Sequence, residues 1–303
     1  MSSSISRTDI SLQQRKVEFD FSESALHWNP QDPFVSHFVS VLHTMLPAGE
    51  FYFCRLYNKA LPLITDEKLK QDLQGFIRQE ASHARAHTHG INNYLKKNNL
   101  EVDSFIEKID WVFEVALDDK PFGITLPKTM ERRWLITRLG IIAALEHYTC
   151  VLGKYALENT QWDQDQADPV ILDILRWHGA EEVEHRNVAF DVYRHLGGNY
   201  WPRYPQMLLV MVAMMGLWCD GTAHLMRQDN HFANPHTKLY GRTFWRLWLN
   251  ASNNKRMPSP AWLVKQALRY LSPNYNPMDE ADTAMATRYL AQSPAARAAA
   301  AIH

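Results

Sequence analysis

The chain of 303 residues is 46% hydrophobic and 21% charged, an ordinary globular composition with enough apolar material for one large domain or two small ones. Its formal net charge of −1 gives no broad electrostatic case for binding nucleic acid. The three cysteines lie far apart without a C-x-x-C pair, which argues against a disulfide framework and favours a reducing, cytoplasmic compartment. Residues 1–21 have no apolar core, so we expect no signal peptide.

The first half of the chain predicts two long helices. An irregular segment over residues 1–33 ends in prolines, and apolar residues then recur at offsets of three and four over residues 34–60. Pro47 predicts a kink within this first helix. A capping sequence, Thr-Asp-Glu, begins a second helical pattern over about residues 65–97.

Two more long helices follow a longer connection. The connection spans residues 101–128 and contains one short helical pattern. A third helix is expected over residues 129–158. Asp168 followed by Pro169 combines an N-cap with proline at the first helical position, and thereby predicts a fourth helix that a pair of glycines ends after Leu196.

These patterns predict an all-α protein. Four long helices with the longest connection between the second and the third indicate a ferritin-like four-helix bundle over residues 34–198. Additional C-terminal helices are expected over residues 199–290, packed on the bundle. Their apolar run at 207–218 is shorter than the ~20 residues that span a bilayer, so we interpret it as a buried helix, with a lipid-facing element as the alternative. The tail over residues 291–303 is expected to be flexible.

Glutamate and histidine recur on the inner faces of the four predicted helices. The fourth helix carries the spacing H-x3-E-x2-H, and residues three, four and seven apart share one helix face. The second helix carries another E-x-x-H pair, and the first and third each offer a glutamate among apolar residues. The candidate metal ligands in chain order are Glu50, Glu80, His83, Glu146, His178, Glu182 and His185.

This order of residues matches the ligand set of carboxylate-bridged di-iron or di-manganese helical bundles. Four carboxylates and neutral imidazoles balance two divalent cations, and two of the carboxylates can bridge both ions. Oxygen and imidazole ligands without sulfur suit two iron ions, or manganese, better than a structural zinc. The alternative interpretation is a set of charged residues on solvated helix faces, but glutamates flanked by leucine, isoleucine and phenylalanine at helical spacing should face the core.

Two histidines are expected to differ from the six core ligands. His178 lies one turn before Glu182 and is expected to be a seventh ligand, the alternative being a core histidine. His87 lies one turn after His83 and is expected beside the site, in contact with a ligand rather than with an ion. His147, beside Glu146, is expected to point elsewhere on its helix and not to be a ligand. Glu181 and Glu184 are expected to point to solvent or to pair with cations.

The ligand spacing resembles the p-aminobenzoate N-oxygenase type of ferritin-like di-iron enzyme over about residues 35–196. That family also has a histidine four residues before the glutamate of its last E-x-x-H, as His178 is here. A wider resemblance covers most of the chain and rests on the sequences PAGEFYF, QEASHARAH, ALEHYT and HGAEEVEHRNVAFDVY. These look like a bacterial family labelled "predicted metal-dependent hydrolase".

The function expected from these patterns is a di-iron oxidoreductase that activates O2 to hydroxylate, desaturate or N-oxygenate an organic, apolar small molecule, with a lipid-like substrate as one alternative. Such a monooxygenase-type reaction needs an electron donor such as a ferredoxin or a reductase. Two alternatives stay open: hydrolysis at a dinuclear metal site, and a ferroxidase or iron-handling protein. Peripheral membrane contact and a homodimer are further alternatives for how the chain associates.

Overall fold

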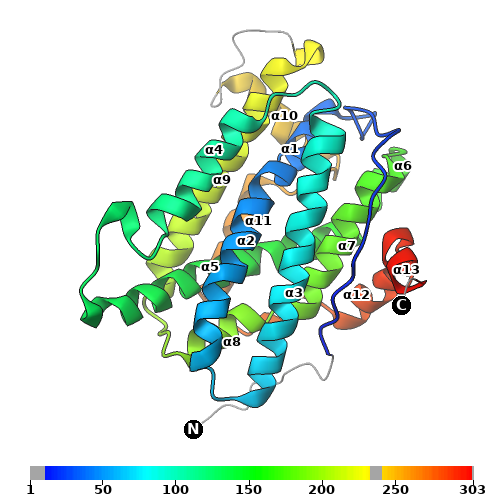
Figure 1. Cartoon of the computed structure of the whole chain (residues 1–303). Coiled ribbons are helices and arrows are strands. Elements are labelled where there is room, and N and C mark those ends of the chain that lie inside the picture. The colour runs from blue at the N-terminus through cyan, green and yellow to red at the C-terminus, as the bar shows by residue number, and fades with distance from the viewer. Residues whose placement is uncertain (1–10, 233–240, 302–303) are drawn as a thin grey trace.

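The computed structural model describes residues 11–232 and 241–301, and within these ranges it contains helices and no strand. The predicted all-α class is confirmed. The centre of the molecule is a bundle of long helices (Figure 1). Its four helices are α2 (Leu42–Ala60), α3 (Glu67–Gly90), α5 (Lys128–Glu158) and α7 (Pro169–His185).

The bundle consists of two helix pairs. α2 packs along α3, α5 packs along α7, and the pairs join where α2 meets α5 and α3 meets α7. Apolar residues at the predicted offsets form the interface: Leu73 and Phe76 of α3 and Leu139 and Ile142 of α5 are completely buried. Burial of each such side chain stabilises the fold by about 1.5–3 kcal/mol relative to an exposed one.

Aspartates at the predicted N-caps set where two bundle helices begin. The carboxylate of Asp66 accepts a hydrogen bond from the backbone N–H of Leu69 at 2.9 Å. Asp168 accepts from the N–H groups of Val170 and Ile171 at the start of α7. These bonds satisfy N–H groups that have no partner inside the helix, and each cap contributes about 1 kcal/mol.

The first predicted helix is divided in two. α1 (Pro33–Ser40) is followed at Val41 by α2, and α2 runs through Pro47 without ending there. The hydroxyl of Thr44 donates to the carbonyl of Val41 at 2.6 Å, which supports the junction between the two helices. The irregularity therefore lies about two turns before the proline at which the sequence predicted it.

The fourth predicted helix is divided as well. α7 ends at His185 and α8 (Val188–His195) begins three residues later. The guanidinium of Arg186 donates to the carbonyl of Val183 and competes with the backbone for that acceptor. The break follows directly after the last predicted ligand, so the H-x3-E-x2-H face stays on one continuous helix.

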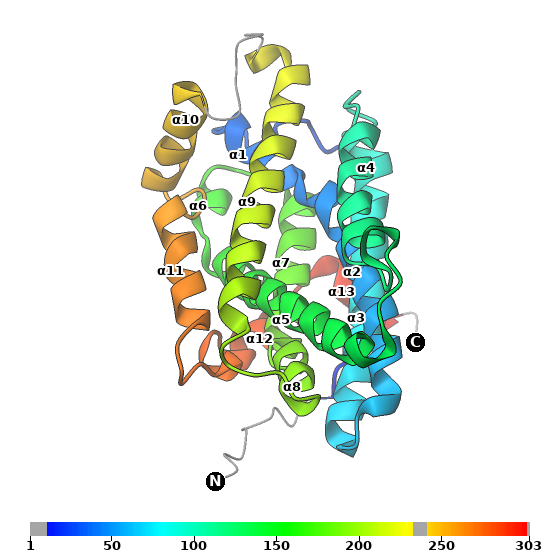
Figure 2. The same cartoon turned by 90° about the vertical axis from the view of Figure 1, so that its left-hand side faces the viewer.

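Further helices cover the bundle. They are α4 (Asp103–Trp111), α6 (Gln161–Gln164), α9 (Arg203–Gln228), α10 (Arg242–Asn253), α11 (Pro260–Tyr270), α12 (Thr283–Leu290) and α13 (Pro294–Ala301). Short 3-10 turns occupy Leu61–Leu63, Pro121–Gly123, Asn230–Phe232 and Pro277–Asp279, and π-helical turns occupy Ile91–Leu95 and Val112–Ala116. α9 packs on α5 and α1, and α11 packs on α5 and α9 (Figure 2).

The predicted flexible tail is largely helical. α13 begins at Pro294 and packs against α7, and the N–H of Ala295 donates to the carboxylate of Asp173 at 3.0 Å. Ala295 and Ala296 are buried. The tail is ordered because small side chains let this short helix lie close to α7, a contact that its low complexity does not reveal.

The N-terminal residues 11–32 form no helix and lie along α3 and α7 (Figure 1). The close fit is clearest at Leu12, because a Cβ added to Gly75 of α3 would lie 2.6 Å from the Cβ of Leu12. This segment therefore covers the outer side of the two helices that carry most of the predicted ligands. Residues 1–10 lie outside the described part of the chain.

Two glycines bring α5 and α7 into backbone contact. A Cβ on Gly153 would lie 2.6 Å from the Cα of Gly179, and a Cβ on Gly179 would lie 2.6 Å from the Cα of Gly153. Only glycine permits this approach. Because Gly179 directly follows His178, the contact fixes the distance between α5 and α7 at the level of the predicted ligands.

Two helices, α5 and α9, are long and apolar enough to cross a membrane, a statement that rests on length and composition alone. The apolar stretch of α5 is 67% buried, as expected for a core helix of the bundle. That of α9 is 39% buried, so α9 exposes much more of its apolar surface. The predicted apolar run at 207–218 is thus the middle of a 26-residue helix.

Candidate metal centre

The seven predicted ligands meet in two adjoining groups inside the bundle, although the sequence places them on four separate helices. In each group the candidate ligand atoms lie within 4.8 Å of one another. The first group has three residues: Glu50 of α2, His83 of α3 and His178 of α7. The second group has four residues: Glu80 of α3, Glu146 of α5, and Glu182 and His185 of α7.

Two glutamates lie between the groups. One carboxylate oxygen of Glu80, Oε1, is 3.4 Å from Nδ1 of His83 and 3.4 Å from Nε2 of His185. Glu182 reaches the same two rings, with Oε1 3.4 Å from His83 and Oε2 3.2 Å from His185. Glu80 and Glu182 therefore each approach one histidine of the first group and one of the second.

The other two glutamates lie at the outer ends of the centre. Glu50 Oε1 is 3.6 Å from Nε2 of His178, and Glu146 Oε2 is 3.4 Å from Nε2 of His185. Two ligand atoms bound to one ion at about 2.0–2.2 Å are separated by about 3.0–3.4 Å when their bonds subtend about 90–110°. Most of these separations match that value better than the usual 2.7–3.2 Å of a hydrogen bond.

Several polar atoms of the centre are buried and have no hydrogen-bond partner among the described residues. They are both carboxylate oxygens of Glu50, Glu80 and Glu146, together with His83 Nδ1 and His185 Nε2. Such atoms cost free energy in a folded protein unless something pairs with them. Two divalent cations would pair with all of them, so the residues present fit a dinuclear metal centre.

Without a cation, the ionised forms of most of the buried carboxylates in this centre are unfavourable. Burial, with repulsion from the neighbouring carboxylates, raises the pKa of Glu50 and of Glu146 well above the usual value, and raises the pKa of Glu80 to about 8. Burial acts the same way on Glu182, but the charge and hydrogen bonds of His185 and His178 outweigh it and hold the pKa of Glu182 well below its usual range. Cations would remove this conflict by favouring the ionised form of every carboxylate.

Hydrogen bonds on the outer side fix the tautomers of two histidines. His83 donates from Nε2 to Glu181 at 2.9 Å, which leaves its Nδ1 bare and directed at Glu80 and Glu182. His185 lies 3.1 Å from the side-chain oxygen of Gln79 through Nδ1, which directs its Nε2 toward Glu80, Glu146 and Glu182. Metal-binding histidines are typically held in this way, with the far nitrogen donating to a protein oxygen.

The N-terminal segment completes these bonds through Arg15. Its guanidinium donates to Glu181 at 2.8 Å and to Glu184 at 2.9 Å, and Glu184 also accepts from Gln79 at 3.1 Å. Glu181 and Glu184 are buried, so the expectation that they point to solvent is wrong, while the alternative of a cation partner is confirmed. No pattern in the sequence points to Arg15 as that partner, because it lies 166 residues before Glu181.

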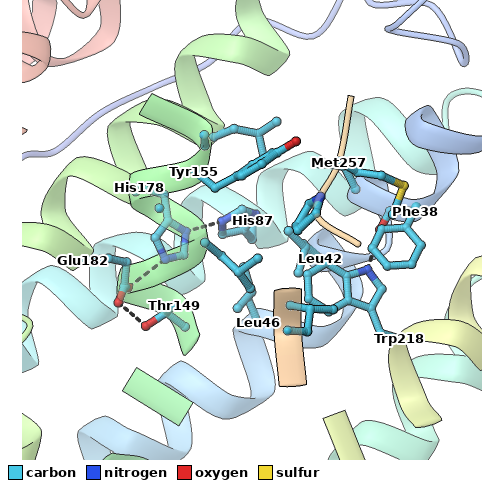
Figure 3. Close-up of a pocket in the computed structure, with 18 of the residues that line it drawn as sticks. Phe38, Leu42, Leu46, His87, Thr149, Tyr155, His178, Glu182, Trp218 and Met257 are labelled. Atoms are coloured by element: carbon cyan, nitrogen blue, oxygen red, sulfur yellow. Dashed lines mark hydrogen bonds and ion pairs between the residues drawn. The ribbon is translucent and has the colours of Figure 1, made fainter. Parts of the chain in front are cut away.

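A row of histidines leads away from the first group. His178 lies 2.9 Å from Glu182 through Nε2 and 2.7 Å from His87 through Nδ1, as Figure 3 shows. His87 in turn lies 3.1 Å from His43. The structure thus places His87 against His178 and outside both ligand groups. Since His178 is hydrogen-bonded to Glu182 at an ordinary distance, its role as a ligand stays a prediction.

Two further residues bear on the expectations from the sequence. His147 lies away from the centre, where its ring contacts the carbonyl of Gln266 at 2.9 Å and the hydroxyl of Tyr275 at 3.0 Å. Thr149, one turn after Glu146, donates its hydroxyl to Glu182 (Figure 3). Thr149 lies three residues after Glu146, so helical spacing alone places it on the same face of α5 as that glutamate.

Two apolar cavities adjoin the centre. The larger, about 220 Å³, is lined by the carboxylates of the four glutamates and by apolar side chains of α2, α4, α5 and α9. The smaller, about 100 Å³, lies on the side of His178 and is shown in Figure 3. The cavities share six lining residues: Leu42, Leu46, Thr149, Leu152, Glu182 and Trp218.

A helical bundle that encloses two groups of buried carboxylates and imidazoles defines this chain as a metal-binding protein of the all-α class. The sequence model of the family described as "predicted metal-dependent hydrolase" matches residues 13–281. The chain therefore belongs to that family. No curated protein and no solved structure matches it.

The family confirms the wider resemblance seen in the sequence and supports a metal-dependent enzyme. It does not support the resemblance to the N-oxygenase type, and its description agrees with the hydrolase alternative better than with O2 activation. Neither the family nor the structure identifies the ions or their number, so two iron ions stay a prediction.

Proposed function

We propose that this protein is an enzyme whose centre holds two divalent cations and whose larger cavity holds an apolar substrate. The observation that carries the proposal is a set of buried atoms without hydrogen-bond partners: six carboxylate oxygens on Glu50, Glu80 and Glu146, and two nitrogens, one on His83 and one on His185. Glu80 and Glu182 would bridge the ions, and Glu50 and Glu146 would bind one ion each.

Hydrolysis is the reaction that the family description favours. Two bound cations lower the pKa of a water molecule and polarise a substrate oxygen. The role of the surrounding residues is to hold the candidate ligands in position and to exclude water. Thr149 holds Glu182 by a hydrogen bond, Glu181 and Gln79 hold the two histidines, and the apolar walls keep bulk water from the substrate.

Oxidation by O2 is a second candidate because of the donors and the cavity lining. Four carboxylates and imidazoles without sulfur are a donor set that suits iron. Within the described residues, no lysine, arginine, asparagine or glutamine lines the larger cavity. A hydrolase usually offers such donors to the oxygen that becomes negative during reaction, whereas oxidation of a hydrocarbon needs an apolar wall.

One experiment tests the metal centre and separates the two reactions. Metal-free protein is loaded with Fe(II), Mn(II) or Zn(II), and the bound metal is counted. Each form is then assayed without O2 on p-nitrophenyl acyl esters, and with O2 and a reductant for oxygen uptake. Hydrolysis predicts ester cleavage by the Mn or Zn form without O2, whereas oxidation predicts uptake by the Fe form alone.

The control is Glu182→Gln, which keeps the size of the side chain but removes its charge. Loss of about two bound ions per chain together with activity is the expected result. Wild-type protein that binds no metal under any of the three conditions would contradict the proposal for both reactions.

A further inference from the structure

α9 presents an uncharged apolar face to the outside of the molecule. No charged residue occurs in residues 204–219. On this stretch Leu208 and Val212, four residues apart on one helix face, are 58% and 62% exposed, and Leu209 beside them is 52% exposed. Large contiguous apolar surface of this kind marks a contact with another molecule or with a membrane.

α11 extends this face. It packs against α9, and both helices form the outer layer on the side that faces the viewer in Figure 2, with α10 next to α11. Val264 and Leu268, again four residues apart, are 47% and 64% exposed. We call the exposed residues of α9, α10 and α11 the α9–α11 face.

The charges on α10, on α11 and on the residues between these two helices are all of one sign. Residues 241–272, which include α10 and α11, contain no acidic residue and six basic ones: Arg242, Arg246, Lys255, Arg256, Lys265 and Arg269. Arg256 pairs with Asp165, and Arg269 pairs with Glu280. In the described part of the chain the other four form no ion pair. A chain with a net charge of −1 thus concentrates positive charge beside its exposed apolar helices.

The larger cavity reaches this face. Leu209 lines the cavity and is also half exposed, so at this residue only one side chain lies between the cavity and the outside of α9. The inward side of the same helix contributes Val210, Ala213 and Met214 to the cavity wall. α9 therefore has apolar residues on both sides and separates the exterior from the carboxylates at the inner end of the cavity.

We propose that the α9–α11 face docks on an anionic lipid surface, and that a single aliphatic chain of a lipid enters the larger cavity beside Leu209. Leu208, Val212 and Leu268 insert among the acyl chains, while Lys265 and its basic neighbours contact anionic headgroups. Amphipathic helices with basic residues beside an apolar face bind membrane interfaces in this way.

A second copy of the chain is the competing occupant. A symmetric dimer through this face would bring the same basic residues of both copies together, and like charges at an interface are unfavourable. An anionic bilayer pairs with those charges instead. A cavity of about 220 Å³ with almost entirely apolar walls exceeds the roughly 150 Å³ that holds a benzene molecule, which suits part of an aliphatic chain.

The delivery of the aliphatic chain to the carboxylates rests on the proposed function, whereas docking on a membrane does not. Docking is therefore tested on metal-free protein. The protein is sedimented with vesicles of phosphatidylcholine alone, and with vesicles that also contain phosphatidylglycerol. We expect binding to the anionic vesicles, at least tenfold weaker binding to neutral ones, and weakening as salt is raised.

Two variants locate the contact. The double variant Leu208→Glu/Val212→Glu should lose binding at least tenfold, and Lys265→Glu should weaken it to a smaller extent. Leu63→Glu is the matched control, because Leu63 is 46% exposed in the turn between α2 and α3, and it should bind as the wild type does. Circular dichroism confirms that each variant is helical.

Three results would contradict the proposed docking. Wild-type protein that stays in the supernatant with anionic vesicles at low salt overturns the proposal. So does a dimer in gel filtration that the double variant converts to a monomer, since the face would then be covered by a second copy. Loss of binding in Leu63→Glu as well would show that the α9–α11 face is not the contact.

Entry of an aliphatic chain into the larger cavity is measured separately, with a fluorescent polyene fatty acid and metal-free protein. Its fluorescence should rise on binding, and Ala213→Trp, which fills the cavity, should lower the affinity at least fivefold while vesicle binding stays unchanged. Equal affinity of Ala213→Trp and wild type would refute entry into this cavity. Because neither measurement requires metal or turnover, failure here is distinct from failure of the proposed reaction.

Discussion

Two clusters of histidine and carboxylate in this protein look alike in composition and differ in geometry. The candidate metal centre holds its nitrogens and oxygens mostly 3.2–3.6 Å apart and leaves buried atoms without hydrogen-bond partners. In the second cluster, Asp229 Oδ2 lies 2.6 Å from His27 and 2.7 Å from His37. These are hydrogen-bond distances, and the other oxygen of Asp229 accepts from the N–H of His231.

The difference teaches how to tell a metal centre from a hydrogen-bonded junction. Both carboxylate oxygens of Asp229 accept hydrogen bonds from protein donors, so the carboxylate needs no cation. Among the described residues the one buried side-chain atom of this cluster without a partner is Nδ1 of His37, on the far side of that ring from Asp229. Its bonds join the N-terminal segment at His27, helix α1 at His37 and the end of α9. We interpret this cluster as a tie that holds three elements together, and each prediction below breaks or sharpens the contrast.

The largest expected effect is the loss of bound metal on removal of a bridging ligand. Glu80→Ala and Glu182→Ala should each reduce the metal bound per chain from about two ions to less than one, because both carboxylates lie between the two groups. Asp229→Ala is the matched control and should leave the metal content unchanged. Elemental analysis of the purified variants measures both, and equal metal loss in all three variants would remove the distinction between the clusters.

The next effect concerns the backbone contact that sets the width of the centre. Gly153→Ala places a Cβ 2.6 Å from Gly179, so α5 and α7 must move apart, at a cost of about 1–3 kcal/mol in the free energy of unfolding. The metal affinity should fall as well, because the candidate ligands on α5 and α7 move apart.

Gly216→Ala on α9 is the control for that change. A Cβ there meets nothing within 4 Å, so alanine should stabilise the protein by up to about 1 kcal/mol through its higher helix propensity. Urea denaturation of both variants gives the comparison. A Gly153→Ala protein as stable as wild type would mean that the helix contact does not constrain the centre.

A smaller effect is expected at Arg15, which touches no candidate ligand. Arg15→Met leaves Glu181 and Glu184 buried without their partner, so the bonds that fix His83 and His185 loosen. Loss of such an outer hydrogen bond typically lowers metal affinity by about 10–100-fold. Competition with a chromophoric chelator measures the affinity. Lys16→Ala, an exposed neighbour on the same segment, should change it little, and an equal loss there would point to the whole segment.

The sequence predicted which residues meet in the candidate centre far better than it predicted their surroundings. Helical spacing orders residues on one face, and the two E-x-x-H motifs with Glu50, Glu146 and His178 led to seven residues that the structure brings together. Arg15 could not be found in this way, because it belongs to an irregular segment whose contacts follow from no periodicity. The tie at Asp229 was missed for the same reason, since it joins three elements that are distant in sequence.

Helix ends show a similar limit. Asp66 and Asp168 were predictable because an N-cap acts on the next three residues. The break after His185 was not, because it depends on a side-chain bond from Arg186 to a carbonyl within its own helix. The helical tail depends on packing against α7, which local composition does not encode.

The smallest effect is a difference in how pH acts on the two clusters in metal-free protein. Burial raises the pKa of Glu80 to about 8 from 4.5, so its contribution to stability is fully present below about 4.5 and is lost as pH rises through about 8. Burial would also raise the pKa of Asp229, but its bonds to His37 and His27 outweigh this and lower it. Its contribution is therefore present above about 4 and is lost at more acid pH.

Melting temperatures of the metal-free protein should accordingly fall between about pH 5 and pH 8, and Glu80→Gln should flatten that slope because the neutral amide cannot ionise. Asp229→Asn should leave this slope intact and remove part of the loss below about pH 4. Added divalent metal should abolish the slope above pH 5, because cations favour ionised carboxylates, and should not affect the acid limb assigned to Asp229. An acid limb that responds to metal as strongly as the neutral one would show that the second cluster also binds an ion.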